Sequence, residues 1–306
     1  MTGIEDQRQL NHPQSAAACS CETLDFHFFI MILLPIEKYA LLKEPIKEVQ
    51  INNFFARSVI ERHVTGRIYV DNLLDPKTFY VLHPYGISLL FGDHSNLQFN
   101  HLFKSYALNP DNGRSSHEWM QTYPREWDPV LDELFGELVI IAAGNRDNKT
   151  TGIIELNTRV NFRFNREKYL QRKKSGLSDS DLMVETDTTH FEQMSGSVIP
   201  LKFWDSASDF REKGKGFTLL HNGRIASTAY SAFVHEGILE IGIETVDGFR
   251  GRGFAEMTCA ALIDYCLERD LTPVWSCRLE NNASYMLAQK LGFEPSLQIP
   301  FYRLSN

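Results

Sequence analysis

The spacing of apolar residues predicts a similar order of helices and strands in the two halves of this chain. In the first half, apolar residues recur at helical spacing over residues 51–66, and short runs rich in β-branched and aromatic residues follow. The predicted strands cover residues 67–70, 78–82, 87–91, 138–142 and 158–164, after a short edge or core element over 32–34. Helices are predicted over 97–106 and 127–135, and a short apolar run spans 119–123.

The second half is easier to interpret. After a basic helix over 166–174 and a strand over 182–185, the dipeptide Asn222-Gly223 joins two apolar runs, and this dipeptide is the strongest short-range signal of a β-hairpin. The predicted strands cover 217–221, 224–233, 238–246, 273–277 and 299–304, and the predicted helices cover 253–269 and 282–291.

Each half therefore reads as a helix, three strands, a helix, a strand, a helix and a strand, which predicts an α+β fold. We divide the chain into a poorly patterned extension (1–30), an N-terminal α+β domain (31–164) and a C-terminal domain (165–306). The matching order indicates a degenerate tandem repeat, and two unrelated lobes remain the alternative. The apolar run over 26–36 is shorter than the about 20 residues that a bilayer-spanning helix needs, so no membrane association is expected.

Composition narrows the function classes. Among 306 residues, 43% are apolar and 23% are charged, so the chain can bury a core. The 39 acidic and 31 basic side chains give a net charge of -8, which disfavours a nucleic-acid partner. The odd number of cysteines, five, and the apolar setting of three of them indicate reduced thiols and a cytoplasmic location. The histidines lack metal-ligand spacing, so no metal is expected.

The segment most informative about chemistry is 241–255, a predicted strand that runs through a glycine-rich turn into a helix. Backbone N–H groups at the helix start, left uncovered by Gly251 and Gly253, can surround a pyrophosphate, and the helix dipole favours its charge. Arg250 and Arg252 add positive charge. Glu256 prevents extension to a GxGxxG motif, and the chain has no GxxxxGK[ST] motif, which weakens dinucleotide and NTP interpretations.

At this point the sequence resembles the GCN5-related N-acetyltransferase (GNAT) superfamily. Its acetyl-CoA signature, [QR]-x-x-G-x-[GA] after the fourth strand, matches Arg250-Gly251-Arg252-Gly253-Phe254-Ala255. A second family element, N-x-x-[AS]-x-x-L followed by G-F, matches residues 281–287 and Gly292-Phe293. These motifs support the resemblance over 198–306. Over 31–306, including His83-Pro84-Tyr85-Gly86, the chain resembles the subgroup that includes zwittermicin A resistance proteins.

The resemblance implies acetyl-CoA as cosubstrate and a GNAT acyltransferase fold in the C-terminal half. The fourth and fifth strands of that fold splay apart, and the thioester would lie between them. Backbone amides of the turn would hold the pyrophosphate, and two fourth-strand residues would pair with the pantetheine amides. The implied acetyl-CoA residues are Ile243, Thr245, Arg250, Gly251, Arg252, Gly253, Phe254, Ala255 and Asn281.

Candidates for proton transfer are fewer. Glu240 and Glu244 project to one face of a strand, and either is a candidate base, directly or through water; ordinary solvent-facing carboxylates are the alternative. Many family members carry a tyrosine as thiolate acid in the last helix, where this chain has Ala288. Tyr285 and Tyr302 are the candidate replacements, with packing roles, or an acid supplied by solvent, as alternatives.

These observations predict direct transfer of acetyl from acetyl-CoA to a primary amine, without a covalent enzyme intermediate. A small-molecule acceptor is favoured because the large first half could enclose a pocket, although an acidic surface would also suit a cationic peptide. A homodimer stays open. Two alternatives remain: a CoA-binding regulatory or interaction protein whose chemistry has lapsed, and a glycine-rich turn that only connects a strand to a helix.

Overall fold

A computed structural model describes residues 31–142, 152–173 and 175–306, and residues 31–306 form one compact unit. The predicted extension over 1–30 lies outside the described residues. The elements of the first half are β1 (Ile32–Leu33), η1 (Ile36–Leu42), η2 (Pro45–Glu48), α1 (Phe54–Ile60), β2 (Arg67–Val70), β3 (Thr78–Leu82), β4 (Ile87–Gly92), α2 (Leu97–Leu108), β5 (Glu118–Tyr123), α3 (Trp127–Phe135), η3 (Gly136–Leu138), β6 (Val139–Ile141) and β7 (Ile154–Phe164).

The second half follows with α4 (Arg166–Gln171), β8 (Asp181–Glu185), α5 (Thr188–Gln193), η4 (Pro200–Lys202), α6 (Ala207–Lys213), β9 (Gly216–His221), β10 (Arg224–His235), β11 (Ile238–Thr245), η5 (Asp247–Phe249), α7 (Phe254–Glu268), β12 (Thr272–Arg278), α8 (Asn282–Lys290) and β13 (Phe293–Leu304). The predicted α+β class is confirmed, and both halves show the predicted order of a helix, three strands, a helix, a strand, a helix and a strand.

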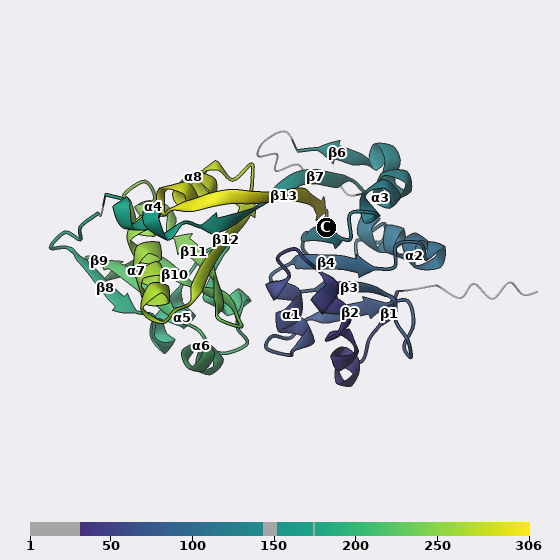
Figure 1. Cartoon of the computed structure of the whole chain (residues 1–306), viewed down its shortest axis with the longest axis horizontal. Coiled ribbons are helices and arrows are strands. Elements are labelled where there is room, and N and C mark those ends of the chain that lie inside the picture. Colours follow the sequence, from purple (N-terminus) through teal and green to yellow (C-terminus); the bar gives the residue numbers. More distant parts are fainter. Residues whose placement is uncertain (1–30, 143–151, 174) are drawn as a thin grey trace, which may run out of the picture. The chain divides into compact units, whose positions relative to one another are not determined.

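The strand order repeats as well. Within one sheet the described strands follow the order β1-β2-β3-β4-β5-β13-β7-β12-β11-β10-β9-β8, so five consecutive strands stand at each end (Figure 1). In both sets the first four strands pair antiparallel and the last pair, β4–β5 or β11–β12, is parallel. We call these sets, with their helices, the N-terminal and C-terminal lobes. The shared order supports a tandem repeat.

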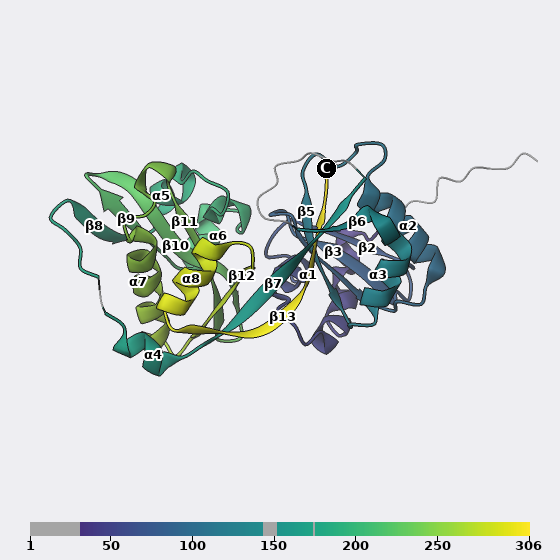
Figure 2. The same cartoon turned by 90° about the horizontal axis from the view of Figure 1, so that it is seen from above.

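Two long strands are exchanged between the lobes. The end of β7 pairs with β12 of the C-terminal lobe, where Phe162 lies opposite Trp275. The end of β13 pairs with β5 of the N-terminal lobe, where Tyr302 lies opposite Met120. β7 and β13 also pair with each other along their length, and Figures 1 and 2 show both running from one lobe into the other. Each lobe therefore completes its sheet with a strand from the other half of the chain.

The two parallel strand pairs differ in one way that creates the site. β4 and β5 pair at five positions, from Ile87 opposite Trp119 to Phe91 opposite Tyr123. β11 and β12 pair only at three positions and separate after Glu240, which lies opposite Val274. A gap between parallel strands therefore opens in the C-terminal lobe.

Helices cover the sheet around this gap. α7 packs on β9, β10 and β11, and α8 packs on β12 and β13, which places Cys259, Leu262 and Leu291 in a buried core. α1 contacts β3 and β4 of the N-terminal lobe as well as β10 of the C-terminal lobe. Because one core cluster includes residues of both lobes, such as Phe79 and Phe210, the lobes are packed together and not only tethered.

Several predicted boundaries were wrong. The helix expected over 51–66 is limited to α1, and Arg62 just beyond it has a left-handed φ of 63°. β13 begins at Phe293 and not at residue 299, and β7 begins at Ile154 and not at residue 158. The run over 119–123 is part of strand β5. The domain boundary at 164/165 stays a prediction. None of the described helices has the length and apolar character that a membrane span requires.

Candidate functional site

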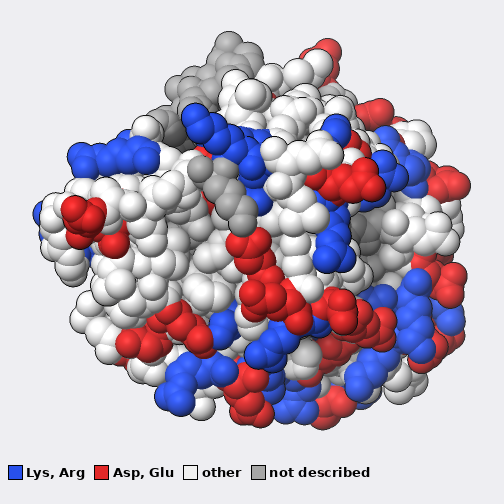
Figure 3. Space-filling model, turned by 60° about the vertical axis from the view of Figure 1, so that its left-hand side comes forward, with Lys and Arg blue, Asp and Glu red and all other residues white. Residues whose placement is uncertain are grey.

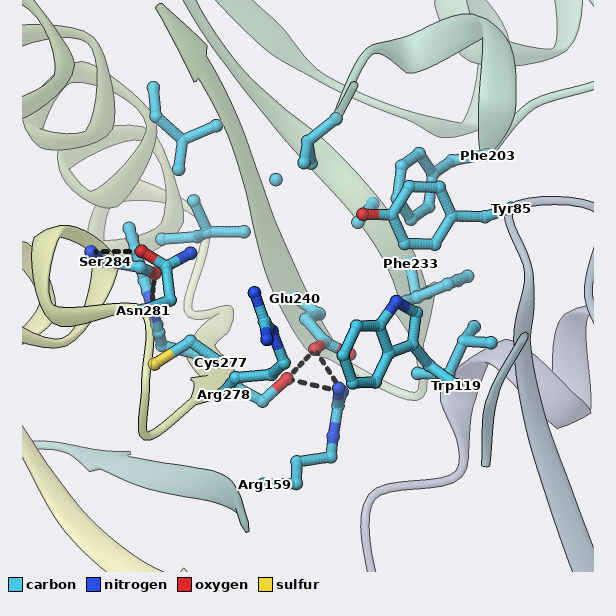
Figure 4. Close-up of a pocket in the computed structure, with 18 of the residues that line it drawn as sticks. Tyr85, Trp119, Arg159, Phe203, Phe233, Glu240, Cys277, Arg278, Asn281 and Ser284 are labelled. Carbon is cyan, nitrogen blue, oxygen red and sulfur yellow. Dashed lines mark hydrogen bonds and ion pairs between the residues drawn. The ribbon is translucent and has the colours of Figure 1, made fainter. Parts of the chain in front are cut away.

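A cavity of about 230 Å³ lies where β11 and β12 separate, and both lobes line it (Figure 4). β11 and β12 supply one side with Glu240, Ile243 and Ser276, whereas Tyr85 and Trp119 come from the N-terminal lobe. The full lining consists of Tyr85, Ile87, Trp119, Arg159, Val198, Phe203, Ala232, Phe233, Glu240, Ile241, Gly242, Ile243, Trp275, Ser276, Cys277, Arg278, Asn281, Ser284 and Phe301. The strand gap is thus the start of a pocket that the other lobe encloses.

The glycine-rich turn follows β11 and leads into α7. Gly251 and Gly253 have φ angles of 78° and 81°, which non-glycine residues rarely adopt. A Cβ atom added to either glycine would meet no atom of the described residues within 4 Å, so this side of the turn is open among them. Gly253 is the N-cap of α7, and no side chain in the described part of the chain caps the helix there. Uncapped N–H groups at the start of a fifteen-residue helix are suited to an anion.

The turn also carries two arginines and a buried aromatic ring. Arg250 pairs with Asp247 at 2.9 Å and with Glu244 at 3.4 Å, and the Arg252 guanidinium lies 5.5 Å from the centre of the Phe249 ring. The Phe254 side chain is buried, so Phe254 and the adjacent Ala255 can offer an anion only their backbone. This half of the predicted cosubstrate site is therefore made of backbone N–H groups flanked by cations.

Glu240 lies at the point where β11 and β12 separate, and the residue as a whole is only 5% exposed. Ser276 donates to Oε1 at 2.5 Å and Asn52 donates to Oε2 at 3.0 Å. Arg159, from the exchanged strand β7, donates to the Ser276 hydroxyl at 2.6 Å, and its Nη2 lies 3.6 Å from Oε1 of Glu240 (Figure 4). Burial lowers the pKa of Arg159 and Glu240 raises it, but a guanidinium stays protonated in proteins.

Glu244 has a different setting. Its Oε2 accepts backbone N–H groups of Ser197 and Val198, each at 2.8 Å, and its Oε1 faces Arg250. Gly196 packs so closely that an added Cβ would lie 2.5 Å from the Glu244 side chain. Glu244 does not line the cavity, whereas Val198 does. The structure therefore places Glu240 in the cavity and uses Glu244 to hold the loop that forms part of its wall.

The other predicted cosubstrate residues lie along the same edge. Ile243 and Asn281 line the cavity, and the Asn281 side chain also caps α8 by accepting the Ser284 N–H at 3.2 Å. Thr245 lies at the end of β11, where its hydroxyl shares a 2.9 Å hydrogen bond with Ser227. Because β11 pairs with β12 only as far as Glu240, the backbone of Ile243 faces the gap without a β12 partner.

Neither predicted tyrosine lines the cavity. Tyr285 packs edge-on against Phe162 at 5.3 Å between ring centres. Tyr302 is buried in the core of the N-terminal lobe, where burial raises the pKa of its phenol above its usual range. Ala288, at the position of the family tyrosine, is fully buried. On α8, the hydroxyl in the cavity belongs to Ser284, which accepts a 3.1 Å hydrogen bond from the Trp275 indole.

The sequence analysis missed the residues that the N-terminal lobe and β7 bring to the site. Asn52 and Arg159 reach Glu240 from far away in the chain, and no local motif marks either one. Aromatic rings form the far wall. The ring centres of Tyr85 and Phe203 are 4.5 Å apart, and those of the stacked pair Trp119 and Phe301 are 5.1 Å apart. Tyr85 lies in the segment His83-Pro84-Tyr85-Gly86, for which the sequence analysis gave a resemblance to a subgroup and no role in a pocket.

No group of three or more His, Cys, Asp or Glu in the described segments is arranged to hold a metal ion. Cys277 lines the cavity, and burial raises the pKa of its thiol, so it is a poor nucleophile there. In the described residues the arrangement comprises an open turn suited to an anion, the edge of β11 beyond its pairing with β12, the buried carboxylate of Glu240 and an aromatic wall.

Comparison with known proteins identifies relatives of the whole arrangement. A family model described as GNAT acetyltransferase matches residues 45–302. The uncharacterized N-acetyltransferase YdfB of Bacillus subtilis is 25% identical over 269 residues, covering 87% of this chain and 95% of YdfB. The crystal structure of a GCN5-related N-acetyltransferase-like protein from Streptococcus suis shares 20% identity and a TM-score of 0.61, covering 88% of this chain and 99% of that one.

A tandem GNAT protein from the clavulanic acid biosynthesis pathway has the same fold, with a TM-score of 0.53 at 9% identity. That likeness covers 89% of this chain and 97% of the tandem protein, so it includes both lobes.

Proposed function

Because this chain belongs to the GNAT acetyltransferase family, we propose that it transfers an acetyl group from acetyl-CoA to the primary amine of a small molecule. The observation that carries this proposal is the buried Glu240 at the point where β11 and β12 separate, inside a cavity that both lobes line. A family fold alone does not indicate a place for the reaction, and this carboxylate and this gap support the one proposed here.

The residues present fit acetyl-CoA. The open turn at Gly251 and Gly253 and the uncapped start of α7 suit the pyrophosphate, with Arg250 and Arg252 nearby. The unpaired edge of β11 at Ile243 suits the amides of an extended pantetheine arm. β4 and β5 stay paired throughout and Asn96 caps α2 with its side chain, so the N-terminal lobe offers no comparable site within its described residues.

When bound, acetyl-CoA supplies a thioester whose carbonyl carbon an amine can attack. Glu240 accepts the proton of the incoming ammonium, directly or through one water, so that the nitrogen lone pair becomes available. The new C–N bond forms as the C–S bond breaks, and the sulfur leaves as a thiolate. Arg159 and Ser276 hold the Glu240 carboxylate in place, because the Ser276 hydroxyl accepts a hydrogen bond from Arg159 and donates one to Glu240.

The departing thiolate needs a hydrogen-bond donor. The Ser284 hydroxyl accepts from Trp275 and lines the cavity, so it keeps one proton to donate there, which also reaches the neighbouring Cys277 thiol. We assign this role to Ser284, with water as the final proton source, in place of the predicted Tyr285 or Tyr302. The short Ala288 side chain leaves no acid at the family position.

A small-molecule acceptor fits the enclosed cavity. Acidic and basic side chains are interspersed on the face shown in Figure 3, and with the net charge of -8 this supports the expectation of no nucleic-acid partner. The zwittermicin A resistance subgroup, the cytoplasmic location and the homodimer remain predictions.

Ala288 also favours a second candidate function, a CoA-binding regulatory or interaction protein that has lost turnover. The two candidates differ in a single measurement. The enzyme releases CoA thiol when an amine is added, whereas the lapsed protein binds acetyl-CoA and releases none.

Thermal unfolding with and without acetyl-CoA tests the cosubstrate site. At about a hundred times its dissociation constant, a ligand adds about 2.7 kcal/mol to the free energy of unfolding, so Tm of the wild type should rise. Gly253→Val should lose this rise. Gly223→Val is the matched control, because Gly223 also has a positive φ, 72°, and open space but lies in the hairpin turn. A wild-type Tm that acetyl-CoA leaves unchanged would refute the proposed function.

A further inference from the structure

We propose that the acceptor is an aminocarboxylate with an apolar or aromatic side chain, bound through its carboxylate by Arg278. This inference rests on the proposed function and names the class of its second substrate. It starts from a cation in the cavity that forms no ion pair with a carboxylate of the described residues.

Arg278 ends β12 and extends between Asn281 and Glu240 toward the open middle of the cavity (Figure 4). Its guanidinium lies 4.5 Å from the centre of the Trp119 ring and donates one hydrogen bond of 3.3 Å to Asn157. Within the described part of the chain it has no ion pair, in contrast to Arg159, which lies 3.6 Å from Glu240. Since Glu240 and Arg159 balance each other, the cavity keeps the positive charge of Arg278.

Acetyl-CoA does not supply the missing anion. Its charged groups are the phosphates, which fit the turn at Gly251 and Gly253, where Arg252 lies nearby and Arg250 is paired with Asp247 and Glu244. The pantetheine arm and the acetyl group, which would reach the strand gap, are uncharged. A guanidinium presents a planar fork of donors that matches a carboxylate, so the second substrate is the source of the anion.

The remaining wall of the cavity is apolar. Tyr85, Phe203 and Phe233 surround one end, and Trp119 and Phe301 form a stacked pair beside the arginines. Burial of an apolar acceptor side chain here would be favourable. A second ammonium, as in lysine, would lose its hydration without a carboxylate partner, and attraction to the ring faces would offset that cost only in part. Glu240 receives the ammonium, Arg278 the carboxylate and the aromatic wall the side chain.

The reaction balances with these groups. The zwitterionic acceptor gives up one ammonium proton to Glu240, directly or through water, and its nitrogen then bonds to the acetyl carbon as the C–S bond breaks. The nitrogen loses a second proton as the amide forms, and the departing thiolate takes up one proton, so one proton in total passes to solvent. The product is an N-acetyl aminocarboxylate that keeps its negative charge opposite Arg278.

The test compares L-phenylalanine with phenethylamine, its analogue without the carboxylate, and with L-phenylalaninamide and L-lysine. Release of CoA thiol gives kcat/KM for each amine. Wild type should prefer L-phenylalanine over phenethylamine by about ten- to a hundredfold, the value of one charge-assisted hydrogen bond to a partly buried cation. Arg278→Gln should bring this ratio close to one without changing KM for acetyl-CoA, and Arg278→Lys should restore part of it.

Arg211→Gln, an exposed arginine of α6 outside the cavity, is the matched control and should keep the wild-type ratio. Equal kcat/KM for L-phenylalanine and phenethylamine in the wild type would overturn the inference, as would an unchanged ratio in folded Arg278→Gln. A rise of KM for acetyl-CoA in that variant would reassign Arg278 to the cosubstrate. If acetyl-CoA raises Tm but none of the four amines causes release of CoA thiol, this acceptor class alone is refuted. If acetyl-CoA does not raise Tm, the proposed function is refuted as well.

Discussion

The side-chain amide of Asn52 donates a 3.0 Å hydrogen bond to Oε2 of Glu240, although 188 positions separate the two residues. Asn52 belongs to the N-terminal lobe, and its backbone carbonyl oxygen accepts a 2.5 Å hydrogen bond from the side-chain amide of Gln121 in β5. One lobe thus orients the carboxylate that the other lobe supplies. The first half of the chain is part of the site, in addition to being a repeat of its fold.

Asn52→Ala should therefore lower activity although the substitution lies outside the C-terminal lobe. A hydrogen bond to a charged group contributes about 1.5–3 kcal/mol, so kcat should fall about tenfold or more while KM for acetyl-CoA is unchanged. Steady-state kinetics measure both. A kcat equal to that of the wild type would show that Glu240 needs no orientation by the N-terminal lobe.

The two candidate carboxylates should respond differently to the same substitution. Both side chains are buried, so Glu240→Gln and Glu244→Gln should each lower the free energy of unfolding. Only Glu240→Gln removes a proton acceptor from the cavity, and it should lower kcat about a hundredfold or more while acetyl-CoA still raises Tm. Chemical denaturation and CoA release, measured together, separate the two effects. Equal losses of kcat in both variants would contradict the assignment of Glu240 as base.

Tyr302→Phe should change little. The phenol lies in the core of the N-terminal lobe, away from the cavity, so kcat should stay within about twofold and the free energy of unfolding within about 1 kcal/mol. Tyr285→Phe serves as the companion variant, since Tyr285 packs against Phe162. A large loss of kcat in either variant would restore that tyrosine as the thiolate acid.

His83 should make stability depend on pH. Burial lowers the pKa of its imidazole to about 3, because the ring lies near Phe203 and Phe233. Its Nδ1 accepts the Tyr85 N–H, whereas its Nε2 has no hydrogen-bond partner among the residues that the structure describes. The folded state therefore holds fewer protons than the unfolded state below the ordinary pKa of about 6.5. The contribution of the neutral His83 to the free energy of unfolding is fully present above that pH. It falls by about 1.4 kcal/mol per pH unit as the pH drops from 6.5 to 3.

Guanidinium unfolding of wild type and His83→Asn at pH 7 and pH 5 checks this sign. Asn keeps an acceptor near the position of Nδ1 but does not titrate. Between the two pH values the wild type should lose about 2 kcal/mol more than the variant. Identical losses would mean that the imidazole can be protonated without cost in the folded state.

The elements of the C-terminal lobe were largely predictable because their signals are local. Asn222-Gly223 marked the hairpin, and Gly251 with Gly253 marked the turn whose left-handed conformations require glycine. The splayed strands were implied by the family resemblance, and the pairing that ends at Glu240 agrees with it. Local pattern was also sufficient for α3, which was predicted at its observed bounds.

The contributions from distant segments could not be predicted. Arg159 occupies a strand position that looks solvent-facing by alternation, and only the pairing of β7 with β12 buries it beside Glu240. Pro295 and Ser296 interrupt the strand pattern, so the first half of β13 was missed, and a register shift occurs there. Non-local pairing has no signature in a single sequence, because either long strand could pair with any compatible edge.

The exchange of β7 and β13 also sets an order on synthesis. The edge of β5 is complete early, but the segment of β13 that pairs with it exists only after the ribosome has added α4 through α8. β7 waits in the same way for β12. Until then two strand edges stay open to incorrect partners, so the nascent chain passes through an aggregation-prone stage that a simple succession of self-contained lobes would avoid.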